Sequence, residues 1–191
     1  MKVSLNTIKQ FTKVDLPVDE LVQKINQQLG GVEGITNLGE RYEGAVIAKV
    51  IKCEKHPNAD KLSLCEIDAG TGENVQVVCG APNVREGLWV VWLKPGATVP
   101  STFEDKQPFV LEARELRGLM SNGMLASAKE LALGDDHNGI VEINPDEWRP
   151  YDTVIKPGAS FAECFGLNDT IIDIENKMFT HRPDLFGHIG V

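Results

Sequence analysis

The stretch His-Pro-Asn-Ala-Asp-Lys-Leu-Ser-Leu (residues 56–64) has the features of a turn that leads into a strand. Pro57 fixes its own backbone φ angle and disfavours a helical conformation for the residue before it. Asn58 and Asp60 can bond to their own backbone and so stabilise a tight loop. From Lys61 onward, polar and apolar side chains alternate, which is typical of a half-buried strand. The stretch therefore predicts a tight turn followed by a strand.

Two later stretches belong with this turn. They are Val-Cys-Gly-Ala-Pro-Asn-Val-Arg (78–85) and Leu-Arg-Gly-Leu-Met-Ser-Asn-Gly-Met-Leu-Ala-Ser (116–127). Around them, short β-rich runs are separated by turn residues, which favours a small barrel or sandwich. We expect strands at 44–53, 62–67, 75–79, 88–93, 109–116 and 139–143, and a helix at 126–133 that Gly134 ends.

The two ends of the chain have a different pattern, with one helical run and isolated strands. We expect a strand at 3–5, a helix at 17–29, a linker at 144–158, one helical turn at 161–165 and a strand at 170–175. We interpret the helix as a packing element.

The net charge of −9 argues against a surface that binds nucleic acid everywhere. The charge is unevenly distributed, because residues 45–130 carry 10 basic and 11 acidic side chains, a net charge of −1. The rest of the chain carries 9 basic and 17 acidic side chains, a net charge of −8. An RNA site must therefore be a local basic patch.

The cysteines and the hydropathy pattern indicate a cytosolic protein. Cys53, Cys65, Cys79 and Cys164 form no C-x-x-C pair, and we interpret them as reduced core thiols. No run approaches the roughly 18 apolar residues that span a membrane. The first residues are too polar for a signal peptide. We therefore expect a cytoplasmic location and no membrane contact.

Taken together and in this order, the three stretches resemble the tRNA-binding module of the EMAP-II type, an oligonucleotide-binding (OB) β-barrel. Both ends are similar to the β subunit of the bacterial phenylalanyl-tRNA synthetase family. These ends are Met-Lys-Val-Ser-Leu-Asn-Thr-Ile-Lys (1–9) and Thr-His-Arg-Pro-Asp-Leu-Phe-Gly-His-Ile-Gly-Val (180–191). The resemblance covers essentially all 191 residues. It implies an N-terminal fragment of a longer chain, which in this family continues toward an editing region.

The resemblance implies an α+β fold in which a five-stranded OB-type β-barrel is inserted into a small discontinuous α+β domain. Residues 40–151 would form the OB-fold tRNA-binding domain. Residues 1–39 plus 152–191 would form the discontinuous N-terminal domain.

The family is an ATP-dependent ligase that attaches phenylalanine to its tRNA, with catalysis on a separate α subunit. The resemblance implies tRNA(Phe) and this α subunit as partners, in a complex of two α and two β subunits. ATP and Mg²⁺ would serve the parent enzyme, while this fragment would hold no cofactor, metal or catalytic residue. The sequence contains no convincing nucleophile–base pair and no phosphate-binding loop.

The candidate tRNA contacts lie in and near the three stretches, because an OB barrel binds nucleic acid on one face and the loops around it. The cations are Lys49, Lys52, Lys55, Lys61, Arg85, Arg114, Arg117 and Lys129. The family motif supplies Asn83, Ser121, Asn122, Met124 and Ser127, and His56 is a turn or phosphate-contact residue. The alternative interpretation is that the lysines are ordinary solvated side chains and that Ser and Asn close turns.

Aromatic side chains on which bases could stack are scarce. Trp89 and Trp92 lie in an apolar run that predicts core positions, whereas Phe103 and Phe109 flank a loop and could be exposed. This favours recognition of RNA by shape and phosphates over the reading of bases.

The sequence is also compatible with three other hypotheses. The spacing of His181, Asp184 and His188 could place zinc ligands on one helical face, but Pro183 interrupts the helix and a fourth ligand is not evident. A near-neutral barrel with few stacking residues also fits a module that braces synthetase subunits and binds little tRNA. A free-standing tRNA chaperone would need a complete chain, which the abrupt end of the sequence opposes.

Overall fold

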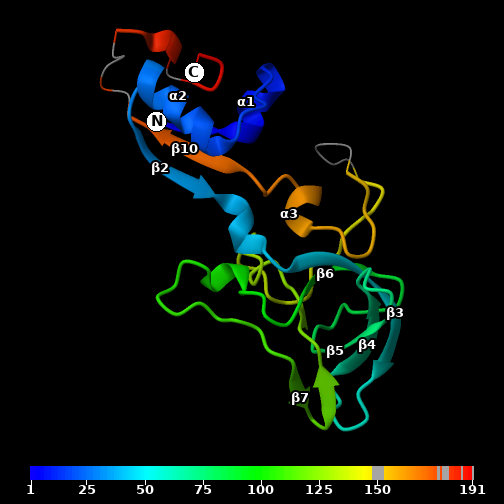
Figure 1. Ribbon diagram of the computed structural model, residues 1–191. Coiled ribbons are helices and arrows are strands. Elements are labelled where there is room, and N and C mark those ends of the chain that lie inside the picture. The colour runs from blue at the N-terminus through cyan, green and yellow to red at the C-terminus, as the bar shows by residue number, and fades with distance from the viewer. Residues whose placement is uncertain (148–152, 176, 178–180, 186, 191) are drawn as a thin grey trace. The chain divides into compact units, whose positions relative to one another are not determined.

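The computed structural model describes residues 1–147, 153–175, 177, 181–185 and 187–190. The chain forms two compact units (Figure 1). One comprises Met1–Glu40 together with Asn168–Val191, and the other comprises Arg41–Leu167. The second unit therefore interrupts the first in the sequence.

The first unit is built on a three-stranded antiparallel sheet. In it, β10 (Thr170–Ile174) lies between β1 (Lys2–Ser4) and β2 (Val32–Asn37). The alternation predicted for β10 is confirmed, because Ile172 and Ile174 are buried while the residues between and before them are partly exposed.

The described part of the first unit also contains two α-helices, of which the sequence predicted only the second, and a short 3-10 helix (Pro183–Leu185). α2 (Val18–Gln28) begins directly after Pro17 and has two acidic residues in its first turn, which complement the positive end of the helix dipole. α1 (Leu5–Phe11) is capped by Ser4, whose Oγ accepts a hydrogen bond from Thr7 N at 3.0 Å. α1 spans only seven residues, too few for a clear helical period.

The second unit is a five-stranded antiparallel barrel in the order β5-β4-β3-β6-β9. The strands are β3 (Ala45–Lys55), β4 (Ser63–Asp68), β5 (Val75–Cys79), β6 (Trp89–Leu93) and β9 (Met124–Leu125). The long strand β3 pairs with both β4 and β6, and its register shifts between Val50 and Lys52. Such a bulge bends the strand and increases its local twist. Residues 45–49 of β3 pair with β6, and residues 49–55 pair with β4. The α+β class and the five-stranded OB-type barrel are thus confirmed.

The segment before β9 joins the two edge strands of this sheet. It forms a hairpin of β7 (Arg114–Leu116) and β8 (Leu119–Ser121). Ser121 Oγ accepts a hydrogen bond from Val78 N at 3.0 Å, and Asn122 N donates to Gln76 O at 3.0 Å. Gln76 Nε2 in turn donates to Met120 O at 2.8 Å. These bonds attach β5 to the chain that enters β9, so the barrel is nearly closed.

The apolar run of β6 is buried on both faces, because the barrel has a core inside and another outside. Val90 and Trp92 pack inside with residues of β4 and β5. Val91 and Leu93 pack outside, against the segments that follow β9. Trp92 is buried as predicted, with its indole N–H donating to Asn122 O at 2.8 Å, whereas Trp89 is only partly buried.

Residues 153–167 pack on the outer face of the barrel. Gly158 N donates to Ile47 O and Ile47 N donates to Ala159 O, each at 2.8 Å. In α3 (Phe161–Cys164), the ring of Phe161 packs edge-on against Tyr42 with 5.6 Å between the ring centroids. The prediction of a linker at 144–158 is therefore wrong for residues 153–158, while 148–152 lie outside the described residues.

Three predicted elements of the barrel segment are irregular instead. Of the predicted strand 109–116, only β7 is regular, and residues 109–111 bond to residues 97–99. The predicted helix 126–133 is a series of turns, which contains one Leu131 N to Ser127 O bond and a positive φ of 54° at Ala132. The predicted strand 139–143 retains one bridge, between Val90 and Glu142. Apart from β7, these segments pack through irregular contacts, with Leu111, Leu131 and Ile143 in the outer core and Ile140 in the inner one.

Replacing Gly123 by alanine should destabilise the barrel more than the same change at Gly72. Both glycines have positive φ angles, 81° and 88°. A Cβ at Gly72 would meet open space, whereas a Cβ at Gly123 would collide with the carbonyl oxygen of Leu93. We expect a cost of about 1 kcal/mol at Gly72 and roughly 3 kcal/mol or more at Gly123, measured by urea denaturation. Equal costs would contradict the close approach of β9 to β6.

Candidate nucleic-acid interface

The loop of residues 56–62 is held against the β7–β8 hairpin by hydrogen bonds. The ring of His56 is buried, its Nδ1 accepts from Asn58 N at 3.1 Å, and its Nε2 lies 3.2 Å from Leu116 O. Because Nδ1 is an acceptor, Nε2 carries the proton and donates to that carbonyl. Asn58 Nδ2 donates to Arg117 O at 3.2 Å. The first and third sequence stretches therefore meet at this point.

The tip of the hairpin is a two-residue turn that exposes an arginine. Leu116 pairs with Leu119, and the two residues between them, Arg117 and Gly118, have φ angles of 54° and 92°. Positive φ at both central positions is the type I′ turn that suits the twist of a hairpin. Arg117 thus lies exposed at the tip while its carbonyl is held by Asn58.

Most of the predicted cations are exposed and have no acidic partner. Lys55 and Lys61 flank the loop, Arg114 and Arg117 lie in the hairpin, and Lys129 follows β9. None of these five forms an ion pair with any residue that the structure describes. Lys49 is half-buried, and its Nζ lies 5.5 Å from the centre of the Trp89 ring.

Two of the predicted cations are neutralised. Lys52 Nζ lies 2.9 Å from Glu54 Oε1. Arg85 binds Glu142 through two hydrogen bonds, of 2.9 and 2.7 Å. These bonds and a third from Asn83 lower the pKa of Glu142 from its usual 4.5 to about 2. Because each charge already has a partner, Lys52 and Arg85 offer less to a phosphate than the unpaired cations do.

The motif residues also have structural partners. Asn83 donates to Ile140 O at 2.9 Å and accepts from Ile140 N at 3.0 Å. Ser121 bonds to β5 as described above. Ser127 and Glu130 form a reciprocal pair, in which Glu130 Oε2 accepts from Ser127 N at 2.6 Å and Ser127 Oγ accepts from Glu130 N at 3.4 Å.

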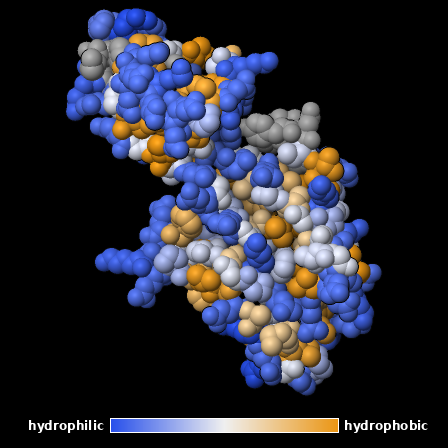
Figure 2. Space-filling view, in the orientation of Figure 1, coloured by the Kyte–Doolittle hydropathy of each residue, from blue (hydrophilic) through white to orange (hydrophobic). Residues whose placement is uncertain are grey.

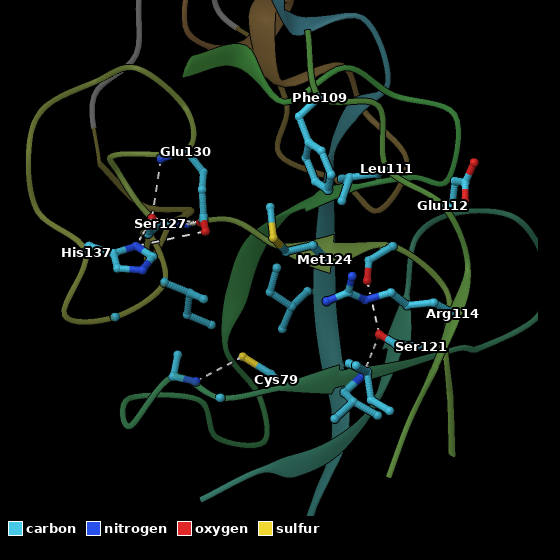
Figure 3. A pocket seen from close by; sticks show the side chains of 18 of the residues that line it. Cys79, Phe109, Leu111, Glu112, Arg114, Ser121, Met124, Ser127, Glu130 and His137 are labelled. Atoms are coloured by element: carbon cyan, nitrogen blue, oxygen red, sulfur yellow. Dashed lines mark hydrogen bonds and ion pairs between the residues drawn. The ribbon is translucent and has the colours of Figure 1, made fainter. Parts of the chain in front are cut away.

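A cavity of about 700 Å³ opens on the barrel where the second and third stretches converge (Figure 3). Four predicted site residues line it: Arg114, Ser121, Met124 and Ser127. The other predicted residues do not line it: Lys49, Lys52, Lys55, His56, Lys61, Asn83, Arg85, Arg117, Asn122 and Lys129. The structure therefore separates the predicted set into a cavity and a group of cations around the loops.

The cavity has an apolar side and a polar side. In Figure 3, Phe109, Leu111 and Met124 lie together, while Ser127, Glu130 and His137 form a hydrogen-bonded group across from them. Sequence reasoning missed Glu130 and His137. The spacing Ser-x-x-Glu at 127–130 is a capping-box signal that could have identified Glu130. No local signal identifies His137, because it reaches Ser127 only through the fold.

Cys65 and Cys79 of the barrel are buried free thiols. Burial raises the pKa of the Cys65 and Cys79 thiols, which favours their protonated form. Among the described residues, no three His, Cys, Asp or Glu side chains are grouped to hold a metal ion. Asp184 pairs with Arg182, and His188 Nε2 accepts from Ser4 N at 2.9 Å.

The surface of the barrel is mixed in polarity. On the face shown in Figure 2, hydrophobic side chains form small separate patches among hydrophilic ones. Within the described part of the chain, no helix is both long and apolar enough to cross a bilayer.

The strand order, the nearly closed barrel and the two long loops define an OB-type module. Residues 45–148 match the model of the family described as putative tRNA-binding domain. This match covers more than half of the chain, and the chain belongs to that family.

The relatives of the whole chain are β subunits of phenylalanine–tRNA ligases. The chain is 36% identical to that of Synechococcus sp., 39% identical to that of Rhodopseudomonas palustris and 38% identical to that of Salinibacter ruber. Each alignment covers 100% of this chain but only 22%, 22% and 23% of the relative. The chain thus spans less than a quarter of the length of these relatives. The alignment with a solved Naegleria gruberi RNA ligase covers 70% of this chain and 35% of the ligase chain, at 16% identity and with a TM-score of 0.42.

The Arg85–Glu142 pair should make the stability of the barrel depend on pH in the acidic range. The pKa of Glu142 is depressed in the folded state, so its stabilising effect is present above the usual pKa of 4.5 and is lost as the pH falls toward 2. Arg85→Gln should raise the pKa of Glu142 toward 4.5, observable by NMR titration of its carboxyl carbon. The control Arg114→Gln should leave that titration unchanged. An ordinary pKa for Glu142 in the unmodified chain would refute the pairing.

Proposed function

We propose that this chain is a tRNA-binding module of a phenylalanine–tRNA ligase β subunit and contributes to the binding of tRNA(Phe). Its membership of the putative tRNA-binding family and its whole-length similarity to these β subunits support the proposal. The module binds and positions RNA and carries out no ligation itself.

The observation that carries the proposal is the joining of the two barrel loops by His56 and Asn58. OB barrels bind nucleic acids with the loop between their first two strands and the loop between their last two. Here these are residues 56–62 and 94–123, and the hydrogen bonds to Leu116 O and Arg117 O bring them together. Lys55, Lys61 and Arg117 are exposed around this junction, where they can contact consecutive phosphates.

The motif residues hold the loops of the barrel in place. His56, Asn83 and Ser121 bond to backbone groups and Ser127 bonds to Glu130, and a fixed loop loses little freedom when it binds RNA. The exposed cations then supply the attraction. A net charge of −1 across residues 45–130 limits this attraction to a local patch.

The proposal places this module in a larger phenylalanine–tRNA ligase. ATP and Mg²⁺ serve aminoacylation on other parts of a cytoplasmic complex with the α subunit. Among the described residues, no three metal-ligating side chains are grouped together. We also propose that the domains follow the two compact units, with a boundary near residue 167 in place of 152, because residues 153–167 pack on the barrel.

A bracing role between synthetase subunits is the second candidate. The ion pairs of Lys52 with Glu54 and of Arg85 with Glu142 favour it, because they reduce the number of cations available to RNA. A brace requires a surface that packs against protein and does not require unpaired cations.

Binding of tRNA(Phe) by the 191-residue chain should fall steeply with salt. Each lost phosphate contact lowers the slope of log K against log salt concentration by roughly 0.7–0.9. We expect this reduction for Lys61→Ala and for Arg117→Ala, measured by fluorescence anisotropy of labelled tRNA between 50 and 200 mM salt. Lys52→Ala is the matched control, because Glu54 already neutralises Lys52. Absence of binding at the lowest salt concentration would contradict an autonomous tRNA-binding role and favour the bracing role between subunits.

A further inference from the structure

The cavity on the barrel has the size of a small-ligand site. Its volume is about 700 Å³, within the range of about 300–1,000 Å³ that is usual for such pockets. A double helix cannot enter a space of this size, but a single nucleotide can. Its lining comes from β5, from the loop before β7, from β9 and from residues 137–140.

Phe109 forms an exposed and firmly held aromatic wall of this cavity. Its backbone N donates to Thr102 Oγ1 at 2.9 Å, and its carbonyl accepts from Val99 N at 2.8 Å. The residue nevertheless remains 54% exposed. Because its backbone is fixed on both sides, the ring presents a stable apolar face to a ligand without further ordering of the chain. Figure 3 shows the ring near Leu111 and Met124 on the apolar side of the cavity.

The charges of the lining favour a base over a phosphate inside the cavity. Glu112 and Glu130 both line it, and carboxylates repel phosphate but accept hydrogen bonds from the amino groups of bases. Glu130 uses Oε2 to bind Ser127, and its Oε1 lies 3.9 Å from Nδ1 of His137. Arg114, which has no acidic partner among the described residues, also lines the cavity and can meet the phosphate of the same nucleotide.

We propose that this cavity accepts one unpaired nucleotide of the bound RNA, with its base stacked on Phe109 and its phosphate at Arg114. This inference rests on the proposed tRNA-binding function and adds the class of RNA feature that the site takes. It assigns recognition to an unstacked base, whereas the sequence had favoured shape and phosphates. Proteins commonly recognise unpaired RNA bases by stacking them on aromatic side chains.

The test compares variants of the 191-residue chain by anisotropy with labelled tRNA(Phe), a short single-stranded RNA and a blunt RNA duplex. Phe109→Ala should weaken binding of tRNA and single-stranded RNA by about five-fold or more, the lower limit expected for loss of one stacked base. It should leave the salt slope and the binding of the duplex unchanged. Phe109→Trp should restore affinity, because tryptophan also stacks. Phe11→Ala removes a phenylalanine that is 59% exposed in the other unit and serves as the matched control.

The salt dependence of binding by Arg114 variants is an independent test. Arg114→Ala should reduce the salt slope by roughly 0.7–0.9 and Arg114→Lys should restore it.

Thermal unfolding of Phe109→Ala shows whether the barrel stays folded. If that variant does not fold, the affinity of Phe109→Trp still tests the inference. Unchanged tRNA affinity in Phe109→Ala, or a loss that tryptophan does not restore, overturns the inference. If Lys61→Ala and Arg117→Ala still weaken binding in that case, the proposed function stands without it. If the unmodified chain binds no RNA, both fail.

Discussion

The hydrogen bonds between β5 and the segment from Met120 to Asn122 are the constraint on which the barrel depends. β5 and β9 are the edge strands of the five-stranded sheet, and β9 has only two residues, too few to close the barrel by its own ladder. Ser121 Oγ and the backbone of Asn122 supply the missing bonds to β5. The same closure places the β7–β8 hairpin beside the loop of residues 56–62 and forms one side of the cavity. Fold and candidate interface therefore have a common origin.

The polar residues of the three sequence stretches divide into two groups by their partners. His56, Asn83, Ser121 and Ser127 have hydrogen-bond partners within the barrel, whereas Lys61 and Arg117 are exposed. A buried polar group that loses its partner costs about 1–3 kcal/mol, so the buried His56, Ser121 and Ser127 are needed for the geometry of the loops. The second group is free to meet phosphates.

Local patterns predicted those elements whose hydrogen bonds and packing follow a regular period. The alternation in β10 and the helical spacing in α2 are of this kind, as is the apolar run of β6, which is covered on both faces. The predictions were wrong for residues 109–113, 126–133 and 139–143, because these residues pack on the barrel through irregular contacts. Sequence patterns also could not predict pairs of residues that are far apart in the chain. The partner of Arg85, for example, lies 57 residues away at Glu142. Such pairs decide which cations remain available, and only the folded structure reveals them.

The most direct test of the account is a map of backbone amide NMR shifts in the 191-residue chain as tRNA(Phe) is added. The account predicts that shifts concentrate in residues 55–62, 109–117 and 121–127, which surround the joined loops and the cavity. Shifts confined to the first unit, or to residues 153–167 on the outer face of the barrel, would contradict it.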